Sequence, residues 1–314
     1  MNSSAEADPM TATTQSALVS HFDAKTLAAL GGLDFKARYV MEGFLAGLHE
    51  SPFHGFSVEF SDYRDYQPGD DLKFIDWRLF ARSDRLCIKR FLQETNVRFY
   101  VVCDSSASMG YRGSTAWGSK LDCARVVGAA MTWFLLRQND AAGLIAIPDA
   151  DTPAYVRPSQ NPSQFGAMLH HLESLQPVGG ACLGTLLQQT VRLAHRRSVI
   201  LLFSDLLEPS AEVQLGIKQL RFHGHEVLVF QVLDRDELEF PFTEGSQFED
   251  LETNIRRQVA PEAVRDRYLS RFNAFMEEHR YFFRSLDIPY CLVRTDSNPW
   301  KALAMFLAER KRLK

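Results

Sequence analysis

A short apolar run, residues 97–103, ends abruptly in a polar loop that carries Asp104, Ser106 and Ser108. A run of this length, rich in aromatic and branched residues, predicts a buried strand. One carboxylate and two hydroxyls at alternate positions suit a hard cation such as Mg²⁺, which prefers oxygen ligands. The same pattern is also typical of a turn that caps the next helix, so the loop by itself leaves both interpretations open.

A second apolar run, residues 199–204, repeats this arrangement and ends at Asp205. If both strands are parallel and central, their carboxyl ends meet at one edge of the sheet, which is where open α/β sheets place ligands. Asp104 and Asp205 would then emerge together, and the loop at Gly179 and Gly180 could approach them. The candidate metal ligands are therefore Asp104, Ser106, Ser108 and Asp205.

From residue 97 onward, predicted strands and helices alternate. Such alternation indicates an α/β fold with a doubly wound, mainly parallel sheet and helices on both faces. Further strands are expected at residues 142–147, 198–204, 226–233 and 289–293, with 155–156 pairing beside the first of them. Helices are expected at residues 120–138, 162–175, 183–195, 212–222, 261–286 and 299–310, and an acidic connector at 234–250.

The chain before this domain divides into two predicted segments. Residues 1–20, rich in Ser, Thr and Ala, predict a disordered tail without an export signal. Residues 21–96 predict a smaller helical and β segment, with helical spacing over 24–49 interrupted by two glycines, and strands at 55–60 and 86–91. Residues 97–314 then form the main domain.

Composition excludes some classes of function. A net charge of -4 does not favour a nucleic-acid binder, which usually carries a basic surplus. The longest apolar run, residues 126–136, is too short to span a bilayer, so no membrane insertion is expected. The five cysteines are scattered and form no C-x-x-C pair, which indicates reduced thiols and a cytoplasmic location.

Two groups of residues resemble known families. The pattern Asp104-x-Ser106-x-Ser108, followed by Ser204 and Asp205, resembles the metal-ion-dependent adhesion site of von Willebrand factor type A domains. Residues 59–71, with 75–77 and 81–82, are similar to the signature of the bacterial DUF58 proteins, a von Willebrand factor A-like family, and the match runs from about residue 27 to residue 310.

The resemblance implies a domain that binds Mg²⁺ or Mn²⁺ at the top of its sheet. In such domains the two loop serines contact the ion, the aspartates act partly through water, and a carboxylate from a partner protein supplies a further ligand. Members are often encoded beside MoxR-type AAA+ ATPases. The resemblance therefore implies a cation-dependent protein-interaction module that works with such an ATPase in chaperone-like assembly or maturation.

One loop departs from the family pattern. Related domains carry a threonine after the two glycines, where this chain has Ala181 and Cys182. Alanine has no ligand atom, and a thiol is a poor match for Mg²⁺. Thr185 lies one helical turn further on, where helix-end packing is as good an explanation as metal binding. We therefore expect a weakened metal site.

Other functions compete with this one. A scaffold with a decayed metal site could dock partners through residues 55–96, where Asp70, Asp71 and Trp77 lie among other acids, aromatics and arginines. A metal-dependent hydrolase is less favoured, because position 106 is Ser rather than a second Asp and no nearby base or nucleophile is evident. Residues 113–120 resemble a phosphate loop only in glycine spacing and predict a surface loop.

Overall fold

A six-stranded sheet forms the centre of the computed structural model, with the strand order β10-β7-β6-β3-β4-β5. All neighbouring strands are parallel except β4 and β5. The structure describes residues 24–50, 63–65, 87–89, 97–147, 153–179, 183–195, 197–208, 210–243, 246–249, 251 and 256–312. The strands are β3 (Arg98–Cys103), β4 (Ala141–Ala146), β5 (Ala154–Ser159), β6 (Val199–Ser204), β7 (Glu226–Leu233) and β10 (Tyr290–Arg294).

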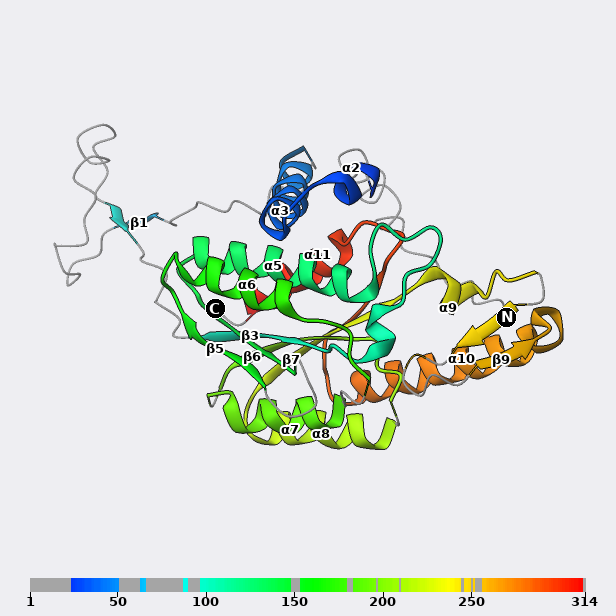
Figure 1. Cartoon of the computed structure of the whole chain (residues 1–314). Helices are drawn as coiled ribbons and strands as arrows, with labels where there is room; N and C mark the ends of the chain where they lie inside the picture. Colours follow the sequence, from blue (N-terminus) through cyan, green and yellow to red (C-terminus); the bar gives the residue numbers. More distant parts are fainter. Residues whose placement is uncertain are drawn as a thin grey trace, which may run out of the picture.

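Helices cover both faces of this sheet, which confirms the predicted α/β fold with a doubly wound, mainly parallel sheet (Figure 1). On one face lie α5 (Lys120–Arg137), α6 (Gln164–Ser174) and α11 (Trp300–Arg312). On the other lie α7 (Leu183–Leu193), α8 (Ser210–Phe222) and the long α10 (Pro261–Ser285). Each of these elements lies within a few residues of its expected range.

The alternating side chains of β3 explain why the sheet needs two layers of helices. Phe99, Val101 and Cys103 belong to the larger hydrophobic core, with α5 and α11. Tyr100 and Val102 belong to the second core, with α7, α8 and α10. Because successive strand residues point to opposite faces, a strand that is apolar throughout must be covered on both sides.

The final helix α11 joins distant parts of the larger core. The ring of Phe306 packs edge-on against Phe99 and Phe134, with centroid distances of 6.3 and 6.2 Å. Arg310 donates from Nε to Oδ2 of Asp140, at 2.8 Å, and both side chains are buried. This ion pair fixes α11 to the turn that precedes β4.

The N-terminal helices follow the sequence prediction closely. Helix α2 (Ala24–Ala29) and helix α3 (Leu33–Glu50) are separated at the two glycines, and Gly32 has a φ of 75°, a conformation that glycine adopts without steric cost. Helix α3 packs on the larger core through Val40, Met41 and Phe44. The predicted tail at 1–20 and the strand at 55–60 lie outside the described residues. Of the 86–91 strand, β2 (Cys87–Lys89) is described and pairs antiparallel with β1 (Tyr63–Asp65).

The acidic connector predicted at 234–250 contains two elements that the sequence analysis missed. Helix α9 (Arg235–Glu239) begins at a capping box, in which Asp234 accepts from the first turn and Glu237 accepts from the backbone N–H of Asp234. Strand β8 (Ser246–Glu249) then pairs antiparallel with β9 (Arg256–Val259). The two strands form a short hairpin outside the central sheet.

The outermost strand on one side of the sheet, β5, is irregular. Its pairing with β4 shifts between Ala142 and Leu144, and Pro158 lies within the strand. Gly143 permits this close approach, since a Cβ there would lie 2.5 Å from the carbonyl oxygen of Val156.

Burial keeps three of the cysteines in the thiol form. Cys103, Cys123 and Cys291 are buried and free, and burial raises the pKa of each thiol, to about 12 for Cys103 and about 11 for Cys291. This agrees with the expectation of reduced core thiols. Within the part of the chain that the structure describes, no helix combines the length and apolar character that a membrane span requires.

Candidate functional site

Four neighbouring strands end at one edge of the sheet, and each is followed by a polar residue. Asp104 follows β3, Asp205 follows β6, Asp234 follows β7 and Thr295 follows β10. Because these strands are parallel, the four side chains gather at the same edge. The predicted meeting of Asp104 and Asp205 is thus confirmed.

The carboxylate of Asp104 is buried and held by hydrogen bonds from the end of β6 and from its own loop. Its Oδ2 accepts from Ser204 Oγ at 2.6 Å, and its Oδ1 accepts from the backbone N–H of Ser106 at 2.9 Å. Burial, together with the charge of Asp205, raises the pKa of Asp104 from 3.8 to about 7 in spite of these bonds. A positive charge nearby would therefore stabilise the ionised form.

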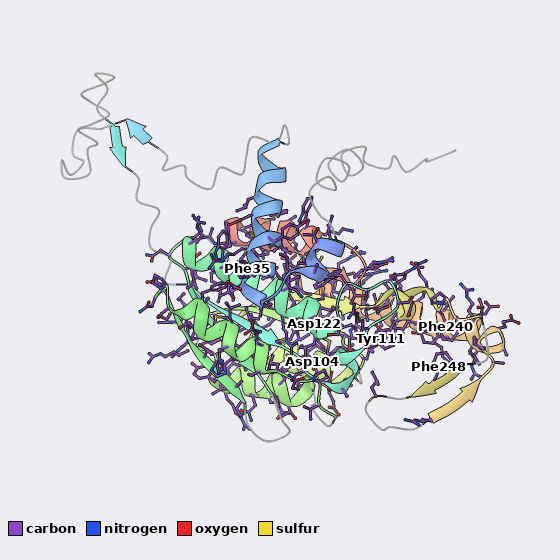
Figure 2. All side chains as sticks on the ribbon, turned by 45° about the horizontal axis from the view of Figure 1, so that its top comes forward. Phe35, Asp104, Tyr111, Asp122, Phe240 and Phe248 are labelled. Carbon is purple, nitrogen blue, oxygen red and sulfur yellow. The ribbon has the colours of Figure 1, made fainter. Side chains whose placement is uncertain are left out.

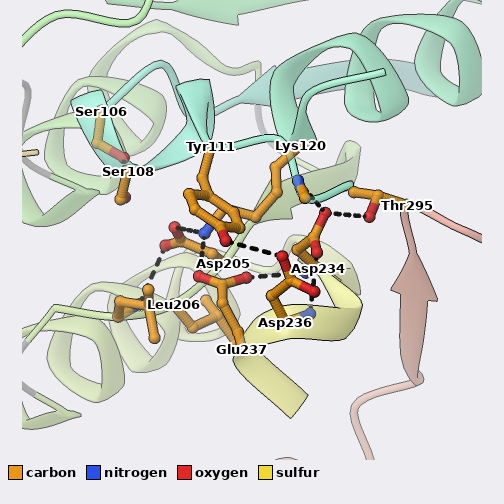
Figure 3. A network of polar contacts seen from close by, with 12 residues as sticks. Ser106, Ser108, Tyr111, Lys120, Asp205, Leu206, Asp234, Asp236, Glu237 and Thr295 are labelled. Carbon is orange, nitrogen blue, oxygen red and sulfur yellow. Dashed lines mark hydrogen bonds and ion pairs between the residues drawn. The ribbon is translucent and has the colours of Figure 1, made fainter. Parts of the chain in front are cut away.

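The two serines of the loop lie side by side. Ser106 Oγ is 3.1 Å from Ser108 Oγ, and both side chains are drawn in Figure 3. Ser106 is buried like Asp104, whereas Ser108, two residues further along the loop, is half-buried.

The third predicted loop also reaches this edge. The backbone N–H of Val178 donates to the carbonyl oxygen of Ser105 at 3.0 Å, so the chain entering Gly179 runs beside the first loop. Residues 180–182, including Ala181 and Cys182, lie outside the described residues. Thr185 is exposed in the first turn of α7.

A carboxylate from the loop after β6 occupies the start of α7. Glu208 accepts from the backbone N–H groups of Leu183 and Gly184, the latter at 3.2 Å. These groups belong to the unpaired donors of a helix N-terminus, where a negative charge is favourable. Glu208 therefore ties the loop of Asp205 to the helix that follows the two glycines.

Lys120 is the main feature of this edge that the sequence analysis did not anticipate. Its Nζ donates to Asp205 Oδ2 at 2.8 Å and to Glu237 Oε1 at 2.6 Å, and its side chain is 0% exposed. Burial opposes the charged form, but the two carboxylates outweigh it and raise the pKa of Lys120 above its ordinary value. The ammonium is thus a fixed positive charge between Asp205 and Glu237.

This finding corrects the prediction of a surface loop at 113–120. Gly113, Trp117 and Lys120 are all buried. A Cβ at Gly113 would lie 2.2 Å from Asp234 Oδ1, because the backbone N–H of Gly113 donates to the carboxylate of Asp234 at 3.0 Å. Lys120 also places an amine beside the candidate ligand Asp205, where the sequence shows no evident base or nucleophile.

A second group of hydrogen bonds continues the network towards β10. Oδ2 of Asp234 also accepts from Thr295 Oγ1 at 2.6 Å. Tyr111 donates from its hydroxyl to Asp236 Oδ2 at 3.0 Å. Figure 3 shows this group beside the ion pairs of Lys120 and Asp205. The edge is therefore rich in buried carboxylates, most of which already have a donor.

The donor set fits a hard divalent cation, but weakly. Asp104, Ser106 and Ser108 offer oxygen atoms of the type that Mg²⁺ and Mn²⁺ prefer, and no described residue forms an ion pair with Asp104. Asp205 is committed to Lys120 through Oδ2, and its Oδ1 accepts from the backbone N–H of Leu207 at 3.1 Å. Among the described residues, no group of three or more His, Cys, Asp or Glu side chains is placed to hold a metal.

Comparison with known proteins gives relatives and structural neighbours. A protein of Mycobacterium tuberculosis and one of Mycobacterium bovis, both described as uncharacterized, are each 27% identical over 297 residues, which is 92% of this chain and 91% of theirs. BatB from Bacteroides thetaiotaomicron aligns over 69% of this chain and 99% of its own, at 16% identity and a TM-score of 0.40. The SpRpn10 VWA domain aligns over 66% of this chain and 93% of its own, at 12% identity and a TM-score of 0.36.

TM-scores this low carry no functional inference, whereas the match to a family model is extensive. The model described as "Protein of unknown function DUF58" matches residues 62–280, well over half of the chain. The chain therefore belongs to the DUF58 family, as its signature residues predict.

Proposed function

We propose that this protein is a non-enzymatic interaction module that binds a partner protein at the carboxyl edge of its sheet, through a divalent cation held by Asp104, Ser106 and Ser108. The observation that carries the proposal is the buried Asp104 carboxylate on the same loop as two neighbouring hydroxyls, those of the buried Ser106 and the half-buried Ser108. A cation bound there would offset the charge of Asp104, and a carboxylate from the partner would complete its coordination. Mg²⁺ or Mn²⁺ would be the ion.

The state of Lys120 supports a binding role over a catalytic one. A lysine that acts as base or nucleophile needs a lowered pKa and access to substrate. Lys120 has a raised pKa, two carboxylate partners and no exposure to solvent. Its ammonium suits the permanent neutralisation of Asp205 and Glu237.

A MoxR-type AAA+ ATPase is the partner we propose, on the strength of the family resemblance. The test is binding of the purified ATPase to the full chain in Mg²⁺ and in EDTA. Binding should fall at least about tenfold in EDTA and equally in Asp104→Ala, since one charge-assisted ligand bond accounts for that much. Asp266→Ala, which removes an exposed carboxylate from α10, is the control and should bind normally.

The ion pair of Lys120 and Asp205 favours one alternative, a module that binds partners without a metal. The Lys120 ammonium already neutralises Asp205, a carboxylate that the family pattern assigns to the metal site. ATPase binding that is insensitive to both EDTA and Asp104→Ala would support this alternative and contradict the cation-dependent mechanism. Docking through residues 55–96 would then be examined with Asp70→Ala and Trp77→Ala, which lie outside the described residues.

A further inference from the structure

An open cavity of about 650 Å³ lies between α10 and the segment that runs from α9 to β8. Its walls are mainly aromatic, and Figure 2 shows Phe240 and Phe248 at the end of the molecule formed by α10 and the hairpin. The aromatic residues that line it are Phe240, Phe248, Tyr268, Phe272 and Phe275. A cavity of this size and character is typical of a binding site.

Contacts among the rings hold the walls in place. Phe240 stacks on Phe248 with centroids 5.6 Å apart and lies 4.8 Å from Tyr268. Tyr268 stacks on Phe272 at 5.5 Å, and its hydroxyl donates to the carbonyl oxygen of Glu237 at 2.9 Å. The cavity is therefore preformed, so little ordering is needed when a ligand enters.

Two arginines give the cavity a positive charge. Arg267 and Arg271 lie one helical turn apart on α10, line the cavity and are exposed. Neither has a hydrogen-bonded or ion-paired carboxylate among the described residues, whereas Arg280 on the same helix is paired with Glu277. An apolar ligand alone would leave both guanidinium groups unused, so the complementary ligand combines an apolar group with a carboxylate.

The cavity also adjoins the loop after β6, which begins at the candidate ligand Asp205. Leu207, which is 41% exposed, lines the cavity, and its backbone N–H donates to Asp205 Oδ1 at 3.1 Å. One extended peptide could therefore contact both the cavity and the loop after β6. This continuity favours a protein partner over a free small molecule.

We propose that this cavity binds a peptide segment of a partner protein, in which an aromatic or branched aliphatic side chain stands next to an acidic residue. The apolar side chain enters the aromatic cavity, and the acidic side chain pairs with Arg267 and Arg271. The proposal rests on the function as an interaction module and adds the sequence that the module selects. It does not require a bound cation.

Selection from a library of random twelve-residue peptides displayed on phage tests this, with the full chain as target in EDTA. The recovered peptides should share an aromatic or aliphatic residue beside Asp or Glu. The most enriched peptide, made synthetically with a fluorescent label, should bind Arg271→Glu at least about tenfold more weakly, because a charge-assisted pair becomes a repulsion. Arg284→Glu makes the same charge change elsewhere on α10, at an exposed position outside the cavity, and should bind normally.

Three outcomes would overturn the proposal. One is a library that yields no acidic-apolar sequence, and another is a selected peptide that binds Arg271→Glu as well as the parent. The third is binding of oleate that Arg271→Glu abolishes while no peptide binds, which would assign the cavity to a lipid tail. Asp104→Ala should not change peptide binding in EDTA. A failure of the peptide proposal is therefore distinguishable from a failure of the proposed cation-dependent binding of the ATPase.

Discussion

Nζ of Lys120 lies 2.8 Å from Oδ2 of Asp205, and both side chains are buried. Lys120 is the first residue of α5 and Asp205 directly follows β6, so the pair joins this helix to one of the two middle strands of the sheet. The second bond of the ammonium, to Glu237, adds α9 to this junction. The ammonium of Lys120 thus holds together α5, the end of β6 and α9.

Loss of that charge should destabilise the protein strongly. Lys120→Met leaves Asp205 and Glu237 buried without a cation, which costs about 3–5 kcal/mol of unfolding free energy. Urea unfolding, followed by circular dichroism, measures the change. Lys301→Met, at an exposed position of α11, is the control and should change the free energy by less than about 0.5 kcal/mol.

Neutralising the carboxylates should recover part of the loss. The triple variant Lys120→Met, Asp205→Asn, Glu237→Gln replaces the charges with polar or apolar groups, so it should be more stable than Lys120→Met alone. The same urea titration compares the two. Equal stability of the single and triple variants would mean that the unpaired charges are not the source of the loss.

Lys120 should also control metal affinity. If Asp205 belongs to the cation site, removal of the ammonium frees one carboxylate oxygen and a negative charge for the ion. Lys120→Met should then bind Mn²⁺ at least about tenfold more tightly than the parent chain, as measured by calorimetric titration. Unchanged affinity would limit the site to Asp104 and the two serines.

The pKa of Asp104 gives stability a defined pH dependence. An acid whose folded pKa is raised above its unfolded value, here from 3.8 to about 7, stabilises the fold in its protonated form. That contribution is complete below pH 3.8 and is lost as pH rises towards 7. The Asp104→Asn side chain stays neutral at every pH, so the stability of this variant relative to the parent should increase between pH 5 and pH 8, by at most about 3 kcal/mol.

Urea unfolding without divalent ions at several pH values tests this expectation. Adding Mg²⁺ to the parent chain at pH 8 should reduce the advantage of Asp104→Asn if the ion binds at this carboxylate. A constant difference across the pH range would show that Asp104 does not titrate as the structure indicates.

His279 should make the protein sensitive to acid. Its ring is fully buried, lies 4.5 Å from the ring centroid of Phe275 and stacks on Phe283, and burial lowers its pKa. The neutral ring is therefore favoured in the folded state, so stability is retained above pH 6.5 and lost as pH falls through the folded pKa. His279→Phe should remove this component, which thermal unfolding between pH 5 and pH 8 would detect as a shallower decline in Tm.

Much of the fold was predictable because it depends on local patterns. The nearly continuous apolar runs of β3 and β6 predict strands buried on both faces, and the rule for parallel strands brings Asp104 and Asp205 to one edge. The break between α2 and α3 follows from two adjacent glycines. None of these inferences requires knowledge of a distant contact.

The partners of Lys120 could not be predicted in this way. Asp205 is 85 residues away in the chain and Glu237 is 117 residues away, so no local spacing links them. Helix α9 is different, because Asp234 and Glu237 have the spacing of a capping box and could have revealed its start. The β8–β9 hairpin is fixed in part by the stacking of Phe248 on Phe240, which depends on the tertiary fold. Binding of a metal stays a prediction.

The irregular strand β5 lowers the tendency of the protein to aggregate through its sheet. An edge strand with free N–H and C=O groups is a template on which a second chain can add, and this is a common route to aggregation. Pro158 offers no N–H group, and the register shift opposite Gly143 distorts the adjoining ladder. The β5 edge of the sheet is thus a poor template for pairing with a strand of another molecule. This opposes aggregation through that edge.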